Sequence, residues 1–259
     1  GFPMGLWASW QLVAQALCFL VGAPLTQRFG WRGVWRLSLL FAAAALVLGL
    51  LFVRTPRGRE TADNGQAGTQ ALGNPSVWAI SLSMLCFCTA CFGFVTWISQ
   101  CWVERVGISL AEANRYISLF AIISIPVIAG TGFLMDHVNR KKFCTFVLPC
   151  YALTTCALFL LTSRRALLGC AFVYPVFEGA ASACLWAIIP HTVRSPSETA
   201  SAMAIFNLCS NVGMLLGPPL TGWAVDLWSW NGAIAVIVLA LLGATFFSRR
   251  VRDEYAKAS

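Results

Sequence analysis

Long apolar runs separated by short polar stretches dominate the chain. A helix that crosses a membrane needs about 20 mainly apolar residues, and eight runs in this sequence meet or approach that length. The pattern therefore predicts an all-α membrane protein, a polytopic helical bundle with eight transmembrane helices. The predicted helices cover residues 4–25, 33–53, 77–103, 110–135, 143–162, 166–189, 200–225 and 232–247.

Composition supports a lipid environment. Of the 259 residues, 58% are hydrophobic and 11% are charged, and the mean hydropathy is +0.73. Soluble domains carry about 25% charged residues, so a soluble chain of this composition could not cover its surface. The net charge of +8 comes from short basic clusters at the ends of apolar runs. Those clusters form no continuous basic face, which excludes nucleic acid as a partner.

One polar segment, residues 54–76, reads as a linker because it is rich in Gly, Thr, Arg and Asn. It separates two helices in residues 1–53 from six helices and a polar tail in residues 77–259. A Pro-Leu-Thr sequence recurs near the end of the first and seventh helices, at residues 24–26 and 219–221. Parallel repeats of this kind relate the two halves of some transporters. The chain begins with Gly1, so we expect it to be an internal fragment of a longer one.

The distribution of Lys and Arg predicts the orientation, because cytoplasmic loops carry an excess of these residues. It places the linker and both termini in the cytoplasm, in what we expect to be the plasma (inner) membrane. One side of the predicted topology holds Arg54, Arg57, Arg59, Arg140, Lys141, Lys142, Arg194, Arg249, Arg250, Arg252 and Lys257, and the other holds Arg28, Arg32, Arg36, Arg105, Arg115, Arg164 and Arg165.

The loop after the fourth predicted helix carries a recognisable motif. It reads Gly132-x-Leu134-x-Asp136, followed by Arg140 and Lys141. This resembles the cytoplasmic loop motif of the major facilitator superfamily of transporters. His137 and Asn139 depart from the usual pattern, which has Arg or Lys at the first position and Gly at the second.

The resemblance implies a twelve-helix fold of which this chain holds helices five to twelve. Residues 1–53 would be the last two helices of the N-terminal half, 54–76 the central cytoplasmic loop and 77–259 the C-terminal six-helix half. It also implies transport of a small solute by alternating access. In similar proteins the motif's aspartate meets the start of a helix from the opposite half and latches the outward-open state. Carried over, Asp136 would face the helix that starts near Met4, with Gly132, Arg140 and Lys141 completing the latch loop.

Polar side chains inside the apolar runs mark a candidate solute and proton pathway, since such groups are costly in a bilayer. Glu178, Asn211 and Gln15 lie near the middle of three different helices, each with a polar companion four residues away on the same face. Those companions are Tyr174, Asn207 and Gln11, and Trp97 and Gln100 are weaker candidates. For the amides, hydrogen bonding between helices and solute contact both stay open.

Glu178 is the acid deepest in the predicted membrane, and burial disfavours its charged form. We expect it to carry a coupling proton, with Tyr174 one turn away donating a hydrogen bond to it. Two alternatives remain. A cationic solute could compete for the carboxylate, or a basic residue outside this chain could pair with it.

Two other classes of protein compete with a transporter. A membrane-embedded enzyme could use Ser182 and His191, but on a continuous helix they would lie about 13 Å apart along the axis. No hydrolase, zinc-protease or phosphate-loop motif occurs. A channel or scaffold subunit would need polar rings that the sequence lacks.

The eleven cysteines include a C-x-x-C at Cys88 and Cys91 without a second ligand pair, so we interpret them as buried apolar side chains. We therefore expect no enzyme activity, metal or cofactor. The expected partners are a small solute, protons and the lipid bilayer, with the protein acting as a monomer. The sequence indicates neither the solute nor the direction of transport.

Overall fold

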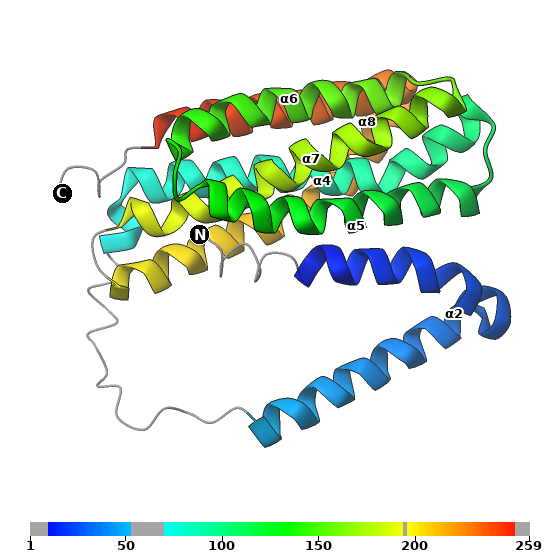
Figure 1. Ribbon diagram of the computed structural model, residues 1–259, viewed down its shortest axis with the longest axis horizontal. Helices are drawn as coiled ribbons and strands as arrows, with labels where there is room; N and C mark the ends of the chain where they lie inside the picture. The colour runs from blue at the N-terminus through cyan, green and yellow to red at the C-terminus, as the bar shows by residue number, and fades with distance from the viewer. Residues whose placement is uncertain (1–9, 53–69, 194–195, 252–259) are drawn as a thin grey trace.

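The computed structural model describes residues 10–52, 70–193 and 196–251, and these segments are almost entirely helical (Figure 1). The helices in this part of the chain are α2 (Trp10–Phe52), α4 (Pro75–Val106), α5 (Leu110–Leu134), α6 (Arg140–Leu160), α7 (Arg164–Ile188), the short 3-10 helix η1 (Ile189–Thr192) and α8 (Pro196–Arg250).

The two longest helices are each interrupted once. Gly30 breaks α2 with a φ of 65°, and Trp228 and Ser229 break α8, where Ser229 has a φ of 54°. At 1.5 Å per residue, the 55 residues of α8 would span about 80 Å. That length is more than twice the thickness of the bilayer core, about 30 Å. The breaks divide each helix into two segments, so the described residues include helical segments from all eight predicted helices, the first of them from Trp10 onward.

Side-chain caps explain where several helices begin. The Asn74 side chain accepts a hydrogen bond from the Ser76 amide at the start of α4, and Ser109 does the same for the Glu112 amide at the start of α5. Asn139, one of the two departures from the usual motif, accepts a hydrogen bond from the Lys142 amide and caps α6. Such caps satisfy amides that a helix leaves unpaired at its N-terminus.

Helices α4 to α8 form the bundle, and α2 lies at its edge (Figure 1). The first half of α2 runs beside α5, and the second half diverges from the bundle. The most apolar window of residues 24–52 contains no buried residue. Large side chains such as Trp35 and Leu50 are 69% and 76% exposed. In a membrane protein such surfaces face lipid or further helices.

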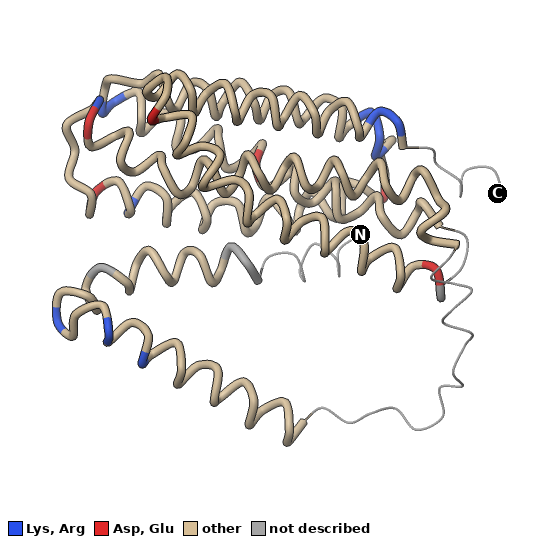
Figure 2. The backbone as a smooth tube through the Cα atoms, turned by 180° about the vertical axis from the view of Figure 1, so that it is seen from behind, with Lys and Arg blue, Asp and Glu red and all other residues tan. Residues whose placement is uncertain are grey.

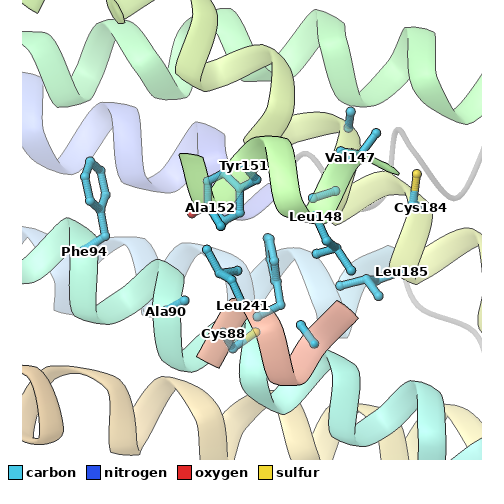
Figure 3. Close-up of a cluster of buried hydrophobic side chains, with 14 of the residues drawn as sticks. Cys88, Ala90, Phe94, Val147, Leu148, Tyr151, Ala152, Cys184, Leu185 and Leu241 are labelled. Atoms are coloured by element: carbon cyan, nitrogen blue, oxygen red, sulfur yellow. The ribbon is translucent and has the colours of Figure 1, made fainter. Parts of the chain in front are cut away.

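Close packing of α4 against α8 forms the centre of the bundle. A Cβ atom on Gly213 or Gly217 of α8 would press against the backbone oxygens of Leu85 and Thr89 on α4. Small residues of this kind let membrane helices approach closely. Figure 3 shows the adjoining cluster, in which side chains from four helices meet. Its labelled members include Cys88, Ala90 and Phe94 of α4, Tyr151 of α6, Leu185 of α7 and Leu241 of α8.

Charged residues of the bundle gather towards its two ends (Figure 2). Six described helices are long and apolar enough to cross a membrane, and the shorter segment Val13–Gly22 is also apolar. Charged residues at the ends and apolar helices between them are expected of a bundle whose middle lies in hydrocarbon. It also makes an acid at mid-length unusual.

Candidate solute-binding site

Glu178 lies near the middle of α7 and is 7% exposed. It follows Arg164, the first residue of α7, by 14 residues, or about 21 Å along the axis. Ser124 has the same offset from Leu110, the first residue of α5. An ion pair between Arg164 and Glu112 joins the starting ends of the two helices. Glu178 and Ser124 therefore lie at the same depth on parallel neighbouring helices.

The carboxyl of Glu178 is held by Ser124. The Ser124 hydroxyl lies 2.6 Å from Glu178 Oε2 and 3.2 Å from the Pro175 carbonyl oxygen. A hydroxyl has a single hydrogen to donate, and the shorter contact assigns it to the carboxyl. A Cβ atom on Gly179 would lie 3.1 Å from the Ser124 carbonyl oxygen. The glycine therefore lets α5 come close enough for this hydrogen bond.

Glu178 faces a partly open cavity of about 370 Å³ between α2, α4 and α7. The volume suits a small organic molecule. Gln15 of α2 lines the same cavity, so the structure brings together two of the predicted pathway residues. The cavity is lined by Ala14, Gln15, Cys18, Phe19, Met84, Phe87, Cys88, Cys91, Phe92, Val95, Glu178 and Ser182, and Glu178 is the charged residue among them.

Tyr174 does not orient Glu178, and that prediction is wrong. Its hydroxyl lies 3.2 Å from the Tyr151 hydroxyl on α6. Its ring stacks on Phe94 with centroids 4.8 Å apart. The helical spacing correctly placed Tyr174 one turn from Glu178, but its hydroxyl meets that of Tyr151 on α6. The hydrogen bond to Glu178 comes from Ser124 instead.

The predicted amides of α8 bond within their own helix. Asn207 Nδ2 donates to the Met203 carbonyl and Asn211 Nδ2 donates to the Asn207 carbonyl, both at 2.8 Å. Neither residue lines the cavity around Glu178. The side chain of Gln11 lies outside the described residues.

The two weaker candidates lie at another site. Trp97 Nε1 donates to the Pro218 carbonyl at 2.9 Å, and Gln100 donates to Glu104 at 2.8 Å. Both line a neighbouring, more open cavity of about 820 Å³ that also includes Asp226 and Trp230. This cavity shares Phe19 and Val95 with the cavity of Glu178, but Trp97 and Gln100 do not line the latter.

The motif loop is held by contacts to the ends of α5 and α8. Arg140 Nε donates to the Met135 carbonyl at 2.9 Å, and its guanidinium lies 3.5 Å from Asp136. Lys141 Nζ donates to the Val251 carbonyl at the end of α8, at 2.8 Å. Gly132 is buried in the last turns of α5. The predicted partner of Asp136, the helix start near Met4, lies outside the described residues.

The residues considered for enzyme activity or metal binding do not form a site together. Ser182 lines the cavity of Glu178, whereas His191 lies beside Arg140 and Lys141 in a small hollow at one end of the bundle. Cys88 and Cys91 line the Glu178 cavity as free thiols. Within the part of the chain that the structure describes, no three His, Cys, Asp or Glu residues are placed to hold a metal ion.

Sequence reasoning missed Ser124 as a site residue. A serine hydroxyl is common in membrane helices, so polarity alone does not single it out. A usable signal was its position 14 residues into its helix, the same offset as Glu178 in a parallel neighbour.

These features define a polytopic α-helical membrane protein with a buried acid facing a solute-sized cavity. Residues 1–195 and 162–259 match the family model of the Major Facilitator Superfamily. The chain belongs to this superfamily, as the motif loop indicated.

Three relatives illustrate its relationships. The chain is 29% identical to monocarboxylate transporter 12 of Xenopus laevis, over 47% of this chain and 27% of the relative. It is 24% identical to the hexuronate transporter of Escherichia coli (strain K12), over 52% of this chain and 31% of that relative. It is 23% identical to the probable galactarate/D-glucarate transporter of Bacillus subtilis (strain 168), over 86% of this chain and 58% of that relative. The matches thus span 27% to 58% of the length of these relatives.

Proposed function

We propose that the protein is a secondary transporter that moves a small solute across a membrane by alternating access, coupled to protons through Glu178. The observation that carries the proposal is a mid-depth carboxyl facing a cavity that α2, α4 and α7 line together. In transporters built from two halves, solute and coupling sites lie near the midplane between the halves. By the family resemblance, α2 belongs to one half and α7 to the other.

A small organic acid is the solute class that we propose. The three relatives are named as transporters of monocarboxylates, hexuronates and galactarate or D-glucarate, all of which are carboxylates. A second carboxylate in the cavity would be repelled by an ionised Glu178. Binding a proton at Glu178 removes that repulsion, so proton and organic acid would enter together.

The substitution Glu178→Gln tests the coupling. The amide keeps the size of the side chain and can still accept the Ser124 hydroxyl, but it cannot titrate. We expect the variant to lose accumulation of a labelled monocarboxylate or hexuronate driven by a proton gradient, while energy-independent exchange persists. Uptake into vesicles with an imposed pH gradient, with and without a protonophore, measures this.

Glu112→Gln is the matched control because it removes an acid at the bundle end, far from the cavity. It should retain accumulation. Accumulation that survives in Glu178→Gln with the parent's pH dependence would remove Glu178 from the mechanism.

The motif loop has a proposed role in the same cycle. Asp136 would latch the outward-open state against the other half, while Arg140 and Lys141 hold the loop to α5 and α8 through the contacts described above. We further propose that the loop and both termini lie in the cytoplasm, that the membrane is the plasma (inner) membrane and that one copy suffices for transport.

A further inference from the structure

A third cavity, of about 910 Å³, lies at the end of the bundle that carries the motif loop. It forms where α4 begins and α8 ends, beside the first turn of α6. It shares no residue with the cavity of Glu178. It is lined by Gly73, Pro75, Ser76, Trp78, Ala79, Leu82, Lys141, Phe247, Arg249 and Arg250.

One side of this cavity is strongly basic. Lys141, Arg249 and Arg250 contribute three positive charges, and no Asp or Glu is among its described lining residues. Lys141 Nζ is anchored on the Val251 carbonyl, and the Arg250 guanidinium lies 4.4 Å from the centre of the Phe246 ring. Arginine side chains bind phosphate through paired N–H donors. This side therefore suits a phosphate group.

Apolar side chains, most of them from α4, also line this cavity. Trp78 is 40% exposed, and its indole nitrogen donates to the Leu72 carbonyl at 2.9 Å. Leu82 lies one turn further along α4 from Trp78 and also lines the cavity, and Phe247 does so from α8. Tryptophan at the end of a membrane helix is typical of the boundary between lipid headgroups and acyl chains. The cavity thus combines three basic side chains with apolar side chains suited to contact with hydrocarbon.

We propose that this cavity binds an anionic phospholipid, with the headgroup phosphate on Arg249, Arg250 and Lys141 and an acyl chain along Trp78 and Leu82. A free phosphate would use only the basic side chains and would leave the apolar side chains without a role. Basic pockets between helices on the cytoplasmic side are typical sites for anionic headgroups, which are enriched in that leaflet. The leaflet rests on the proposed orientation, but binding itself can be measured without assuming orientation or transport.

The test is native mass spectrometry of the full-length protein titrated in detergent with phosphatidylglycerol or phosphatidylcholine. The parent should retain phosphatidylglycerol in preference, and less of it as salt is raised, because salt screens exposed charges. Each Lys or Arg near a membrane surface adds enough attraction for about a fivefold change in affinity. We therefore expect Arg249→Gln with Arg250→Gln to bind phosphatidylglycerol roughly 25-fold more weakly.

The matched control, Lys142→Gln with Arg165→Gln, removes two exposed charges that do not line the cavity and should bind as the parent does. Equal loss in both double variants would assign the effect to net charge and overturn the proposal. Inorganic phosphate and glycerol phosphate serve as competitors, and displacement of the lipid by either at similar concentration would identify a free-anion site instead. If the arginine variant fails to fold, equal retention of both lipids by the parent would equally overturn the proposal.

Discussion

At the scale of single residues, the setting of Glu178 depends on contacts from other helices. Ser124 reaches it from α5, and Gln15 shares its cavity from α2. Tyr174, its neighbour on the same helix, bonds to Tyr151 instead. Spacing along one helix identifies side chains on one face, but the partners of that face come from packing. Burying a polar group without a hydrogen-bond partner is costly, so the helices that supply the partners determine the setting of Glu178.

Asp136, unlike the buried Glu178, is exposed at the surface of the motif loop. Its ion pair with Arg140 has both side chains partly exposed, at 41% and 25%, and such pairs contribute little to stability. We expect Asp136→Asn to leave the melting temperature close to the parent's. We also expect it to slow uptake several-fold by weakening the proposed outward-open latch. Uptake assays and the rate of external labelling of Ser229→Cys, which should fall, measure the two effects.

His137→Asn is the control for Asp136→Asn, since it alters the adjacent exposed loop residue. Unchanged uptake and unchanged labelling in Asp136→Asn would show that the aspartate has no part in switching.

At the scale of helices, glycines and breaks determine how the chain packs. Gly213 and Gly217 form a small-residue stripe that brings α8 onto α4. Pro218 and Pro219 follow directly, and each lacks the amide that would bond a carbonyl one turn earlier. Trp97 of α4 donates to the Pro218 carbonyl, so a hydrogen bond also joins α4 to α8 beside these prolines.

Gly217→Ala tests this close contact. The added Cβ would press on the Thr89 carbonyl oxygen and lie 2.9 Å from the Gly93 amide nitrogen. Both are backbone atoms, which yield less easily than side chains. Overpacking of this kind costs about 1–3 kcal/mol, so the melting temperature in detergent should drop by several degrees. Gly130→Ala is the same change at a position with open space around the Cβ and should have no such effect. Equal melting temperatures for the two variants would contradict the packing argument.

At the scale of the whole molecule, the ends of the bundle differ in charge. The motif loop and the end of α8 bring Arg140, Lys141, Lys142, Arg249 and Arg250 to one end. The opposite end carries an ion pair between Glu112 and Arg164, and Glu104 accepts a hydrogen bond from Trp230 there. Counted over the full sequence, eleven Lys and Arg residues are assigned to the first end and its flanking segments, against seven at the opposite end. The positive-inside rule then predicts that the first end faces the cytoplasm.

Cysteine labelling on a background without native cysteines tests the orientation. Lys142→Cys should be protected from a membrane-impermeant maleimide applied outside intact cells, and Ser229→Cys should react. Both positions are exposed in the structure, so burial cannot explain protection. Permeabilised cells provide the control, in which both should react. Labelling of Lys142→Cys alone in intact cells would show that the orientation is the opposite of the predicted one.

The sequence by itself determined the class of fold, the number of spans and their approximate ends, because lipid demands long apolar helices with their backbone groups paired internally. It also identified the superfamily, through the spacing of Gly132, Asp136 and Arg140, and it identified Glu178 as an acid at mid-depth.

Tertiary structure decided what surrounds that acid. Ser124 bonds to Glu178, and Gln15 lines the same cavity. Trp97 and Gln100 line a neighbouring cavity. The amides of Asn207 and Asn211 bond to carbonyls of their own helix. The hydrophobic pattern of each helix depends only on local order along the chain, whereas the partner of a polar side chain depends on which helices meet and at what rotation.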